Sequence, residues 1–296
     1  MKCAILAFDA LEYNFVKLFQ LTNLKQKEFG KVRIPQECFV KVKTDYYEEN
    51  LFEPQTPLVW FSFLTGKKPT EINFNPLRWE IDLFNILSIK TTWIQKFLRK
   101  FNSVRKLEDK IIDSLNLKKK RSRISDYCVP TIFNLTEKSY AFNVPLYSEN
   151  WHGWGYGLDP KGFTSFKEFI NAVLRSQLAE FNREKENVLQ FLGKKKDWEL
   201  FMAYFYILDV YGELCFSKPS LLSQIYSMVD DFVYKIRNRL EDAFILIVSD
   251  HGVEPLPNTP FGRHSQYAFY STNLKLGLKN PEITDFYYLI KKILSI

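Results

Sequence analysis

The chain has 296 residues, of which 46% are apolar, 17% aromatic and 25% charged, and its net charge is +7. This composition excludes a disordered, collagen-like or low-complexity protein, and a chain of this length buries enough surface to fold without disulfides or a structural metal. We therefore expect one globular domain over residues 1–296. The four cysteines form no C-x-x-C pair, which argues against a zinc ribbon or a thioredoxin-like motif.

The apolar run at the start of the chain stops at Asp9, before it reaches the length of a secretory signal sequence. The longest apolar stretch, Leu200–Leu208, has nine residues and is too short to span a membrane. These features predict a cytoplasmic protein with no membrane span.

The first predicted element is a strand over Cys3–Phe8, whose unbroken apolar pattern is typical of a parallel strand buried on both faces. A short helix is predicted next, with Thr56 as its N-cap, Pro57 at the first helical position and Gly66 just after its end. The region 76–165 is aromatic, basic and irregular, and we interpret it as an insertion or cap over the sheet.

Within this region, residues 96–123 contain eleven Lys or Arg and three acidic residues, a local net charge of +8. Apolar residues recur there at helical spacing, which predicts a basic amphipathic helix or a pair of helices. The basic residues of this stretch either lie on a solvated helix face or form a patch that attracts a phosphate-bearing substrate or a polyanion.

In the second half of the chain, helical patterns alternate with buried strands. Ser165 and Glu168 form a capping-box pair at the start of one helix, and Pro219 opens another. Apolar strands are predicted after each helix, over Glu199–Leu208 and Ala243–Val248. This alternation predicts an α/β fold with a doubly wound, mostly parallel sheet and helices on both faces.

All three predicted buried strands run into an aspartate, namely Asp9, Asp209 and Asp250, and His251 follows the last of them. In open α/β sheets, functional groups gather beyond the carboxyl ends of the strands. Carboxylate together with imidazole suits zinc, manganese or iron better than calcium or magnesium. The sequence therefore predicts a metal site at this edge of the sheet.

Thr56 is the candidate reactive group. As an N-cap it would lie at the positive end of a short helix, where backbone N–H groups bind phosphate oxygens. A threonine hydroxyl is a poor nucleophile until it is deprotonated, which a nearby metal ion would favour. The structural alternative is a simple helix cap.

Several motifs together resemble the alkaline phosphatase superfamily, and within it the type I phosphodiesterase/nucleotide pyrophosphatase branch. The matching segments are AILAFDALEYN, TPLVWFSFLTGKKP, AFNVPLYSENW, DWELFMAYFYILDVYGE, ILIVSDHGVEP and GRH at 262–264. Their order and spacing cover most of the chain, whereas the span 76–130 has no match.

In the family that the chain resembles, two divalent cations, usually zinc, flank a Ser or Thr nucleophile, which here is Thr56. The ligands that the resemblance implies for the first cation are Asp9, Thr56, Asp250 and His251. For the second cation they are Asp209, His264 and the residue four positions after the aspartate. That residue is Glu213 instead of the family's histidine. Glutamate binds zinc, manganese or iron, so this site has either an altered metal preference or is degenerate.

Three further residues are candidates for substrate binding. Asn73 or Asn75 would correspond to an amide that contacts phosphate after the turn at Gly66. His152 lies in a Trp-His-Gly-Trp stretch, and it either lines the substrate pocket or is a structural or surface histidine.

The expected function is metal-dependent hydrolysis of phosphate esters through a phosphothreonine, with a phosphodiesterase or nucleotide pyrophosphatase activity on a small phosphate ester or nucleotide. One alternative is a phosphomonoesterase or a metal-dependent phosphomutase on the same core. The other is a catalytically silent homologue that binds a polyanion through residues 96–123.

Overall fold

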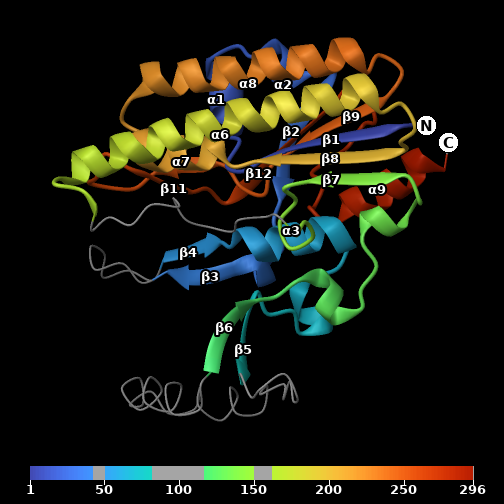
Figure 1. Ribbon diagram of the computed structural model, residues 1–296, viewed down its shortest axis with the longest axis horizontal. Helices are drawn as coiled ribbons and strands as arrows, with labels where there is room; N and C mark the ends of the chain where they lie inside the picture. Colours follow the sequence, from blue (N-terminus) through green and yellow to red (C-terminus); the bar gives the residue numbers. More distant parts are fainter. Residues whose placement is uncertain (43–50, 82–116, 150–161, 296) are drawn as a thin grey trace.

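A computed structural model of the protein describes residues 1–42, 51–81, 117–149 and 162–295 (Figure 1). Within these residues the central sheet has six strands. In spatial order they are β2 (Glu28–Arg33), β12 (Tyr267–Thr272), β9 (Phe244–Val248), β1 (Cys3–Phe8), β8 (Leu200–Phe205) and β7 (Ser139–Phe142). Strands β9, β1, β8 and β7 pair in parallel, whereas β12 is antiparallel to both of its neighbours. The predicted α/β fold with a mostly parallel sheet is confirmed.

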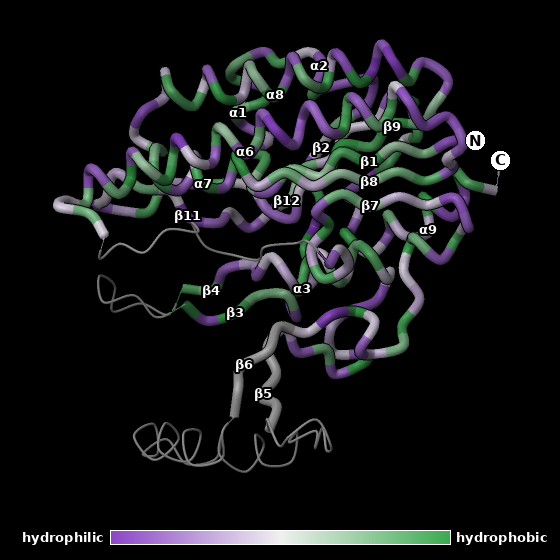
Figure 2. The backbone as a smooth tube through the Cα atoms, viewed as in Figure 1, coloured by the Kyte–Doolittle hydropathy of each residue, from purple (hydrophilic) through white to green (hydrophobic). Residues whose placement is uncertain are grey.

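The middle strand β1 shows why its apolar run is unbroken. All six of its residues are fully buried, and successive side chains point to opposite faces of the sheet. Ala4, Leu6 and Phe8 pack into one core and Cys3, Ile5 and Ala7 into the other. The hydrophobic colour of β1, β8 and β9 in Figure 2 follows from burial on both faces.

Helices cover both faces of the sheet, as Figure 1 shows. One face packs against α1 (Tyr13–Leu18), α2 (Thr22–Lys25), α6 (Phe166–Lys194), α7 (Ile207–Cys215) and α8 (Pro219–Arg239). The other face packs against α3 (Thr56–Thr65) and α9 (Asp285–Leu294). At the start of α6, the Ser165 hydroxyl accepts a hydrogen bond from the Glu168 N–H, as predicted. None of the helices in the described residues has the length and apolar character needed to cross a membrane, and the predicted cytoplasmic location stays a prediction.

Within the described ranges, smaller elements surround this core. Three pairs of antiparallel strands are β3 (Phe39–Val42) with β4 (Leu51–Pro54), β5 (Leu77–Ile81) with β6 (Leu117–Arg121), and β10 (Val253–Pro255) with β11 (Gly262–His264). Four 3₁₀ turns are η1 (Gln36–Cys38), η2 (Pro69–Ile72), η3 (Ile124–Tyr127) and η4 (Ile132–Asn134).

The prediction for Glu199–Leu208 was too long, because the strand ends at Phe205 and α7 begins at Ile207. Both segments are buried and apolar, so hydropathy alone does not mark the change from strand to helix. Asp209 therefore lies in the first turn of α7 and not at the end of a strand.

The predicted insertion, 76–165, also extends too far. Residues Ser139–Phe142 form β7, an edge strand of the central sheet, and Ile132 and Val144 are buried in the core beside it. A four-residue, half-buried edge strand carries too short a pattern to be recognised. Most of the basic stretch 96–123 lies outside the described residues, and so does His152.

Candidate functional site

The predicted strand-end residues meet at one edge of the sheet. Strands β9, β1 and β8 are adjacent and parallel, so their carboxyl ends lie together. Asp9 follows β1 directly and Asp250 follows β9 by two residues, while the first turn of α7 supplies Asp209 after β8. All three carboxylates are buried, with at most 4% of the residue exposed.

His251 connects two of these carboxylates. Its Nε2 lies 3.1 Å from Asp9 Oδ1 and 3.4 Å from Asp250 Oδ2. Its Nδ1 lies 3.0 Å from the Gly252 carbonyl oxygen, a contact in which Nδ1 donates and Nε2 faces the carboxylates.

The charges of this group shift one another's pKa values. Burial raises the pKa of Asp9, but hydrogen bonding and charge from His251, and the hydroxyl of Tyr204, more than offset it, so the net shift is downward. Burial and the charge of Asp9 raise the pKa of Asp250 to about 7. Burial lowers the pKa of His251, yet the two aspartates raise it well above its usual value. Without a bound cation, Asp250 and His251 therefore hold a proton more tightly than in water, whereas Asp9 favours its charged form.

The second group contains Asp209, Glu213 and His264. His264 Nε2 lies 3.4 Å from Glu213 Oε1 and 3.7 Å from Asp209 Oδ1, and its Nδ1 lies 2.9 Å from the carbonyl oxygen of Pro54. Burial and the nearby His251 lower the pKa of His264, but the hydrogen bond to Glu213 and the two carboxylate charges raise it to about 9. Burial, followed by the charge of Glu213, raises the pKa of Asp209 well above its usual value.

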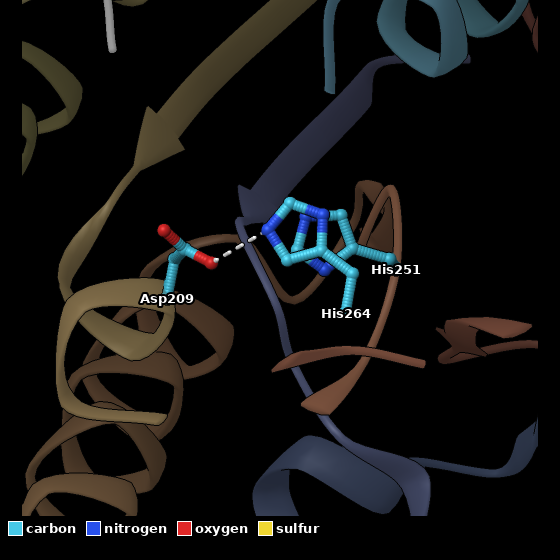
Figure 3. Close-up of side chains that lie close together, drawn as sticks. All are labelled: Asp209, His251 and His264. Atoms are coloured by element: carbon cyan, nitrogen blue, oxygen red, sulfur yellow. Dashed lines mark ion pairs between the residues drawn. The ribbon is translucent and has the colours of Figure 1, made fainter. Parts of the chain in front are cut away.

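The two groups are joined through their histidines. Figure 3 shows the rings of His251 and His264 stacked, with the Asp209 carboxylate directed at His264. The ring centroids are 3.7 Å apart and the planes differ by 16°. The seven candidate ligands thus form one continuous cluster and not two separate sites.

Several buried oxygens of this cluster, namely Asp9 Oδ1, Asp209 Oδ1 and both carboxylate oxygens of Asp250, lack a hydrogen bond of regular geometry, and apart from the second Asp250 oxygen each of them lies near a histidine ring nitrogen. Buried carboxylates without hydrogen-bond partners are costly unless they are paired or bind a metal. Two sets have ligand atoms within 4.8 Å of one another, Asp9 with Asp250 and His251, and Asp209 with His251 and His264. Their oxygen and nitrogen donors fit divalent zinc, manganese or iron.

Thr56 lies beside the first group, but the predicted N-cap role is wrong. Gln55 is the N-cap of α3, and its carbonyl oxygen accepts from the Leu58 and Val59 N–H groups. Thr56 is the first helical residue, and its Oγ1 lies 3.3 Å from His251 Nε2. Because the hydroxyl does not cap the helix, it faces the cluster from the positive end of α3.

A pocket of about 350 Å³ opens beside Thr56. Its lining residues are Val40, Val42, Glu53, Pro54, Gln55, Thr56, Pro57, Tyr206, Asp209, Glu213 and His264. Neither Asn73 nor Asn75 is among them. Asn73 ends η2 in the left-handed conformation, and the backbone of Asn75 is hydrogen-bonded to the Tyr127 hydroxyl. Their contact with substrate stays a prediction.

The sequence interpretation missed four polar residues near the cluster. The Tyr204 hydroxyl donates to Asp9 Oδ2, and Tyr206 and Glu53 line the pocket. Burial raises the pKa of Glu53, although the charge of His264 opposes this. Glu12 contacts the segment after His251. The two tyrosines could have been found from the sequence, because polar-tipped side chains at the carboxyl end of a buried strand indicate the functional edge of the sheet.

Among the solved structures to which the chain is similar are three distant relatives. Human ectonucleotide pyrophosphatase/phosphodiesterase 5 is 11% identical with a TM-score of 0.52, covering 100% of this chain and 95% of that chain. The inactive murine protein of the same name, in complex with AMP, is 12% identical with a TM-score of 0.44, and the match covers 87% of this chain but 59% of that one. PH0037 from Pyrococcus horikoshii is 12% identical with a TM-score of 0.47, covering 99% and 96%.

The human structure shows that the fold is shared. A comparison with curated proteins gives no match. A family model described as type I phosphodiesterase/nucleotide pyrophosphatase matches residues 40–270, which include Thr56, Asp209, Asp250 and His264. This match extends over well more than half of the sequence, and the chain therefore belongs to the type I phosphodiesterase/nucleotide pyrophosphatase family of the alkaline phosphatase superfamily.

Proposed function

We propose that this protein is a metal-dependent hydrolase of phosphoric diesters in which Thr56 is the nucleophile and forms a phosphothreonine. The substrate class is a small phosphodiester or a nucleotide. The observation that carries this proposal is the position of the Thr56 hydroxyl, which lies at the start of α3 and 3.3 Å from His251 in a cluster of buried carboxylates.

Two divalent cations, zinc first and manganese or iron as alternatives, suit the donor atoms of the cluster. Asp9, Thr56, Asp250 and His251 would hold one of them, and Asp209, Glu213 and His264 would hold the other. Bound cations supply positive charge that favours the deprotonated hydroxyl and offsets charge on the phosphoryl oxygens.

The protein's own groups account for binding and orientation. The oxygen of Thr56 forms a bond to phosphorus while the bond to the leaving oxygen breaks, and water then hydrolyses the phosphothreonine and restores the hydroxyl. The N–H groups at the start of α3 favour negative charge beside Thr56. The ring of His264 is held through its Nδ1 by the Pro54 carbonyl, and this leaves Nε2 turned toward the cluster.

The charge of the pocket favours a diester over a monoester. Among the described residues that line it, none is Lys or Arg, whereas Glu53 and Glu213 are acidic. Arg263 pairs with Glu254 at 2.6 Å, so the cation nearest to His264 in sequence is already neutralised. A phosphomonoester or a phosphomutase substrate carries one more negative charge than a diester, and beyond the bound cations the described lining offers no Lys or Arg to balance it.

The test is hydrolysis of bis-p-nitrophenyl phosphate compared with p-nitrophenyl phosphate, by purified protein with Zn²⁺ or Mn²⁺. We expect faster hydrolysis of the diester. Thr56→Val keeps the shape of the side chain and removes the hydroxyl, so it should reduce turnover at least about 10³-fold. Thr70→Val, at an exposed threonine of the following turn, should leave turnover unchanged.

Retained turnover in Thr56→Val would remove Thr56 from its role. A protein that hydrolyses neither ester with any of these metals would overturn the enzymatic proposal and leave the catalytically silent homologue as the remaining interpretation.

A further inference from the structure

We propose that Glu12 is a positioning residue that sets the relative placement of His251 and His264, and with it the affinity of the cluster for its metals. This proposal rests on the proposed function. Glu12 lies in the segment after β1, three residues beyond Asp9, and only 5% of it is exposed.

The Glu12 carboxylate contacts its own segment, as the N-cap of α1, and two segments that are distant in the sequence. Its Oε1 accepts from the N–H of Asn14 at 2.9 Å. Its Oε2 accepts from the N–H of Val253 at 3.1 Å. The same oxygen lies 3.4 Å from the Ser265 hydroxyl, whose single proton is shared between Glu12 and the Tyr267 carbonyl oxygen at 3.2 Å. The backbone N–H of Glu12 donates to the hydroxyl of Tyr226 in α8 at 3.0 Å, which anchors the backbone of this residue to a long helix.

The partners of Glu12 lie next to the two histidines. Val253 follows Gly252, whose carbonyl oxygen lies 3.0 Å from His251 Nδ1 and also accepts from the Ser265 N–H at 2.9 Å. Ser265 directly follows His264. A single oxygen of the Glu12 carboxylate therefore contacts both the peptide that holds the His251 ring and Ser265, the residue after His264.

Close packing around Gly252 supports this arrangement. A Cβ atom at position 252 would lie 2.0 Å from Glu12 Oε2 and 2.8 Å from the Ser265 hydroxyl oxygen. Both distances are far shorter than any van der Waals contact. A side chain at position 252 would therefore displace the Glu12 carboxylate from its present position.

The consequence for the metals follows from the stacked rings. His251 and His264 have ring centroids 3.7 Å apart, and each ring directs Nε2 to a different pair of carboxylates. A shift of Val253 or Ser265 changes the distance between these two ring nitrogens. Residues that orient metal ligands in this way typically change metal affinity by about 10–100-fold when they are removed.

The first test is Glu12→Gln, which keeps the size of the side chain but replaces one acceptor oxygen with an NH₂ donor. Titration of metal-free protein with Zn²⁺ and Mn²⁺ should show at least about tenfold weaker binding. The matched control is Glu28→Gln, because the Glu28 carboxylate likewise accepts from backbone N–H groups, those of Leu276, Gly277 and Leu278. Glu28 begins β2, at the edge of the sheet opposite the cluster, so its variant should bind metal like the parent.

The second test is a double-mutant cycle between Glu12 and Gly252, with metal affinity and thermal stability of the metal-free protein as readouts. Gly252→Ala alone should weaken metal binding by more than tenfold. In a Glu12→Ala background, the same substitution should have a smaller further effect, because the clash with the carboxylate is gone and only the 2.8 Å contact with the Ser265 hydroxyl oxygen remains.

The two proposals fail in different ways. If the parent binds no divalent metal, both the proposed function and the role of Glu12 are overturned. If the parent binds metal and Glu12→Gln binds it equally well, or if Glu28→Gln weakens binding to the same extent, the role of Glu12 alone is overturned. Additive effects in the cycle would likewise contradict a direct contact between Glu12 and position 252.

Discussion

Replacing Tyr204 by phenylalanine removes one hydroxyl group from beneath the metal-binding cluster. The hydroxyl donates to Asp9 Oδ2, and the residue is only 4% exposed. The ring packs edge-on against Trp60, with centroids 5.6 Å apart and planes at 88°, and phenylalanine keeps that contact. The substitution therefore isolates the hydrogen bond to the carboxylate.

The expected cost follows from the charge of the acceptor. Asp9 stays ionised, because hydrogen bonding and charge from His251, with the Tyr204 hydroxyl, hold its pKa below the usual range against the effect of burial. A hydrogen bond to a charged group contributes about 1.5–3 kcal/mol, compared with about 1 kcal/mol for a neutral one. For a domain of this size, about 2 kcal/mol corresponds to a fall in Tm of about 3 °C.

The matched control is Tyr211→Phe. The Tyr211 hydroxyl is also buried, but it donates to a neutral acceptor, the carbonyl oxygen of Leu174, at 3.0 Å. Thermal unfolding of the metal-free proteins should give a loss for Tyr204→Phe about twice that for Tyr211→Phe. Metal titration should show about 10–100-fold weaker binding for Tyr204→Phe only, because Asp9 loses the hydrogen bond that orients its other carboxylate oxygen, Oδ1.

Equal losses of Tm in the two variants would refute the argument that Asp9 is ionised and hydrogen-bonded in the folded protein. Unchanged metal affinity in Tyr204→Phe would refute the argument that this hydroxyl orients a ligand.

Two further predictions concern pH and metal preference. Burial raises the pKa of Glu184 from 4.5 to about 8, so the folded state holds its proton more tightly and the protein loses stability as pH rises through that window. Glu184→Gln cannot ionise and keeps an acceptor for Asn143. In denaturation series, the free energy of unfolding of this variant should exceed that of the parent by near zero at pH 4.5 and by about 1–3 kcal/mol above pH 8. A difference that is independent of pH would contradict this. Glu213→His should raise affinity for Zn²⁺ over Mn²⁺ on the order of tenfold in competition titrations, because imidazole suits zinc, and an unchanged ratio would mean that position 213 is not a ligand.

Much of the site could be predicted because its residues are placed by local patterns. The apolar run of β1 ends at Asp9, and that of β9 ends just before Asp250 and His251. A parallel sheet then brings such residues to one edge, whatever the length of chain between them. The gathering of Asp9, Asp250 and His251 at this edge was therefore open to sequence reasoning, whereas Glu213 was named as a candidate ligand through the resemblance to the family.

Other features required the tertiary structure. Thr56 was expected to cap α3, and only the packed helix shows that Gln55 is the cap and that the hydroxyl meets His251, 195 residues away. Likewise, the first residues of α7 are as apolar as β8. The boundary between strand and helix before Asp209 therefore depends on packing and cannot be read from hydropathy.

The sequence by itself determined the α/β fold, the buried central strand and the set of residues at its carboxyl edge, because hydropathy and spacing act locally and repeat in each unit. The tertiary structure alone decided which polar side chains support that set. Glu12 reaches Val253 across 241 positions, and Tyr204 reaches Asp9 across 195. No local pattern encodes such contacts, since each depends on how separate elements come together in the folded chain.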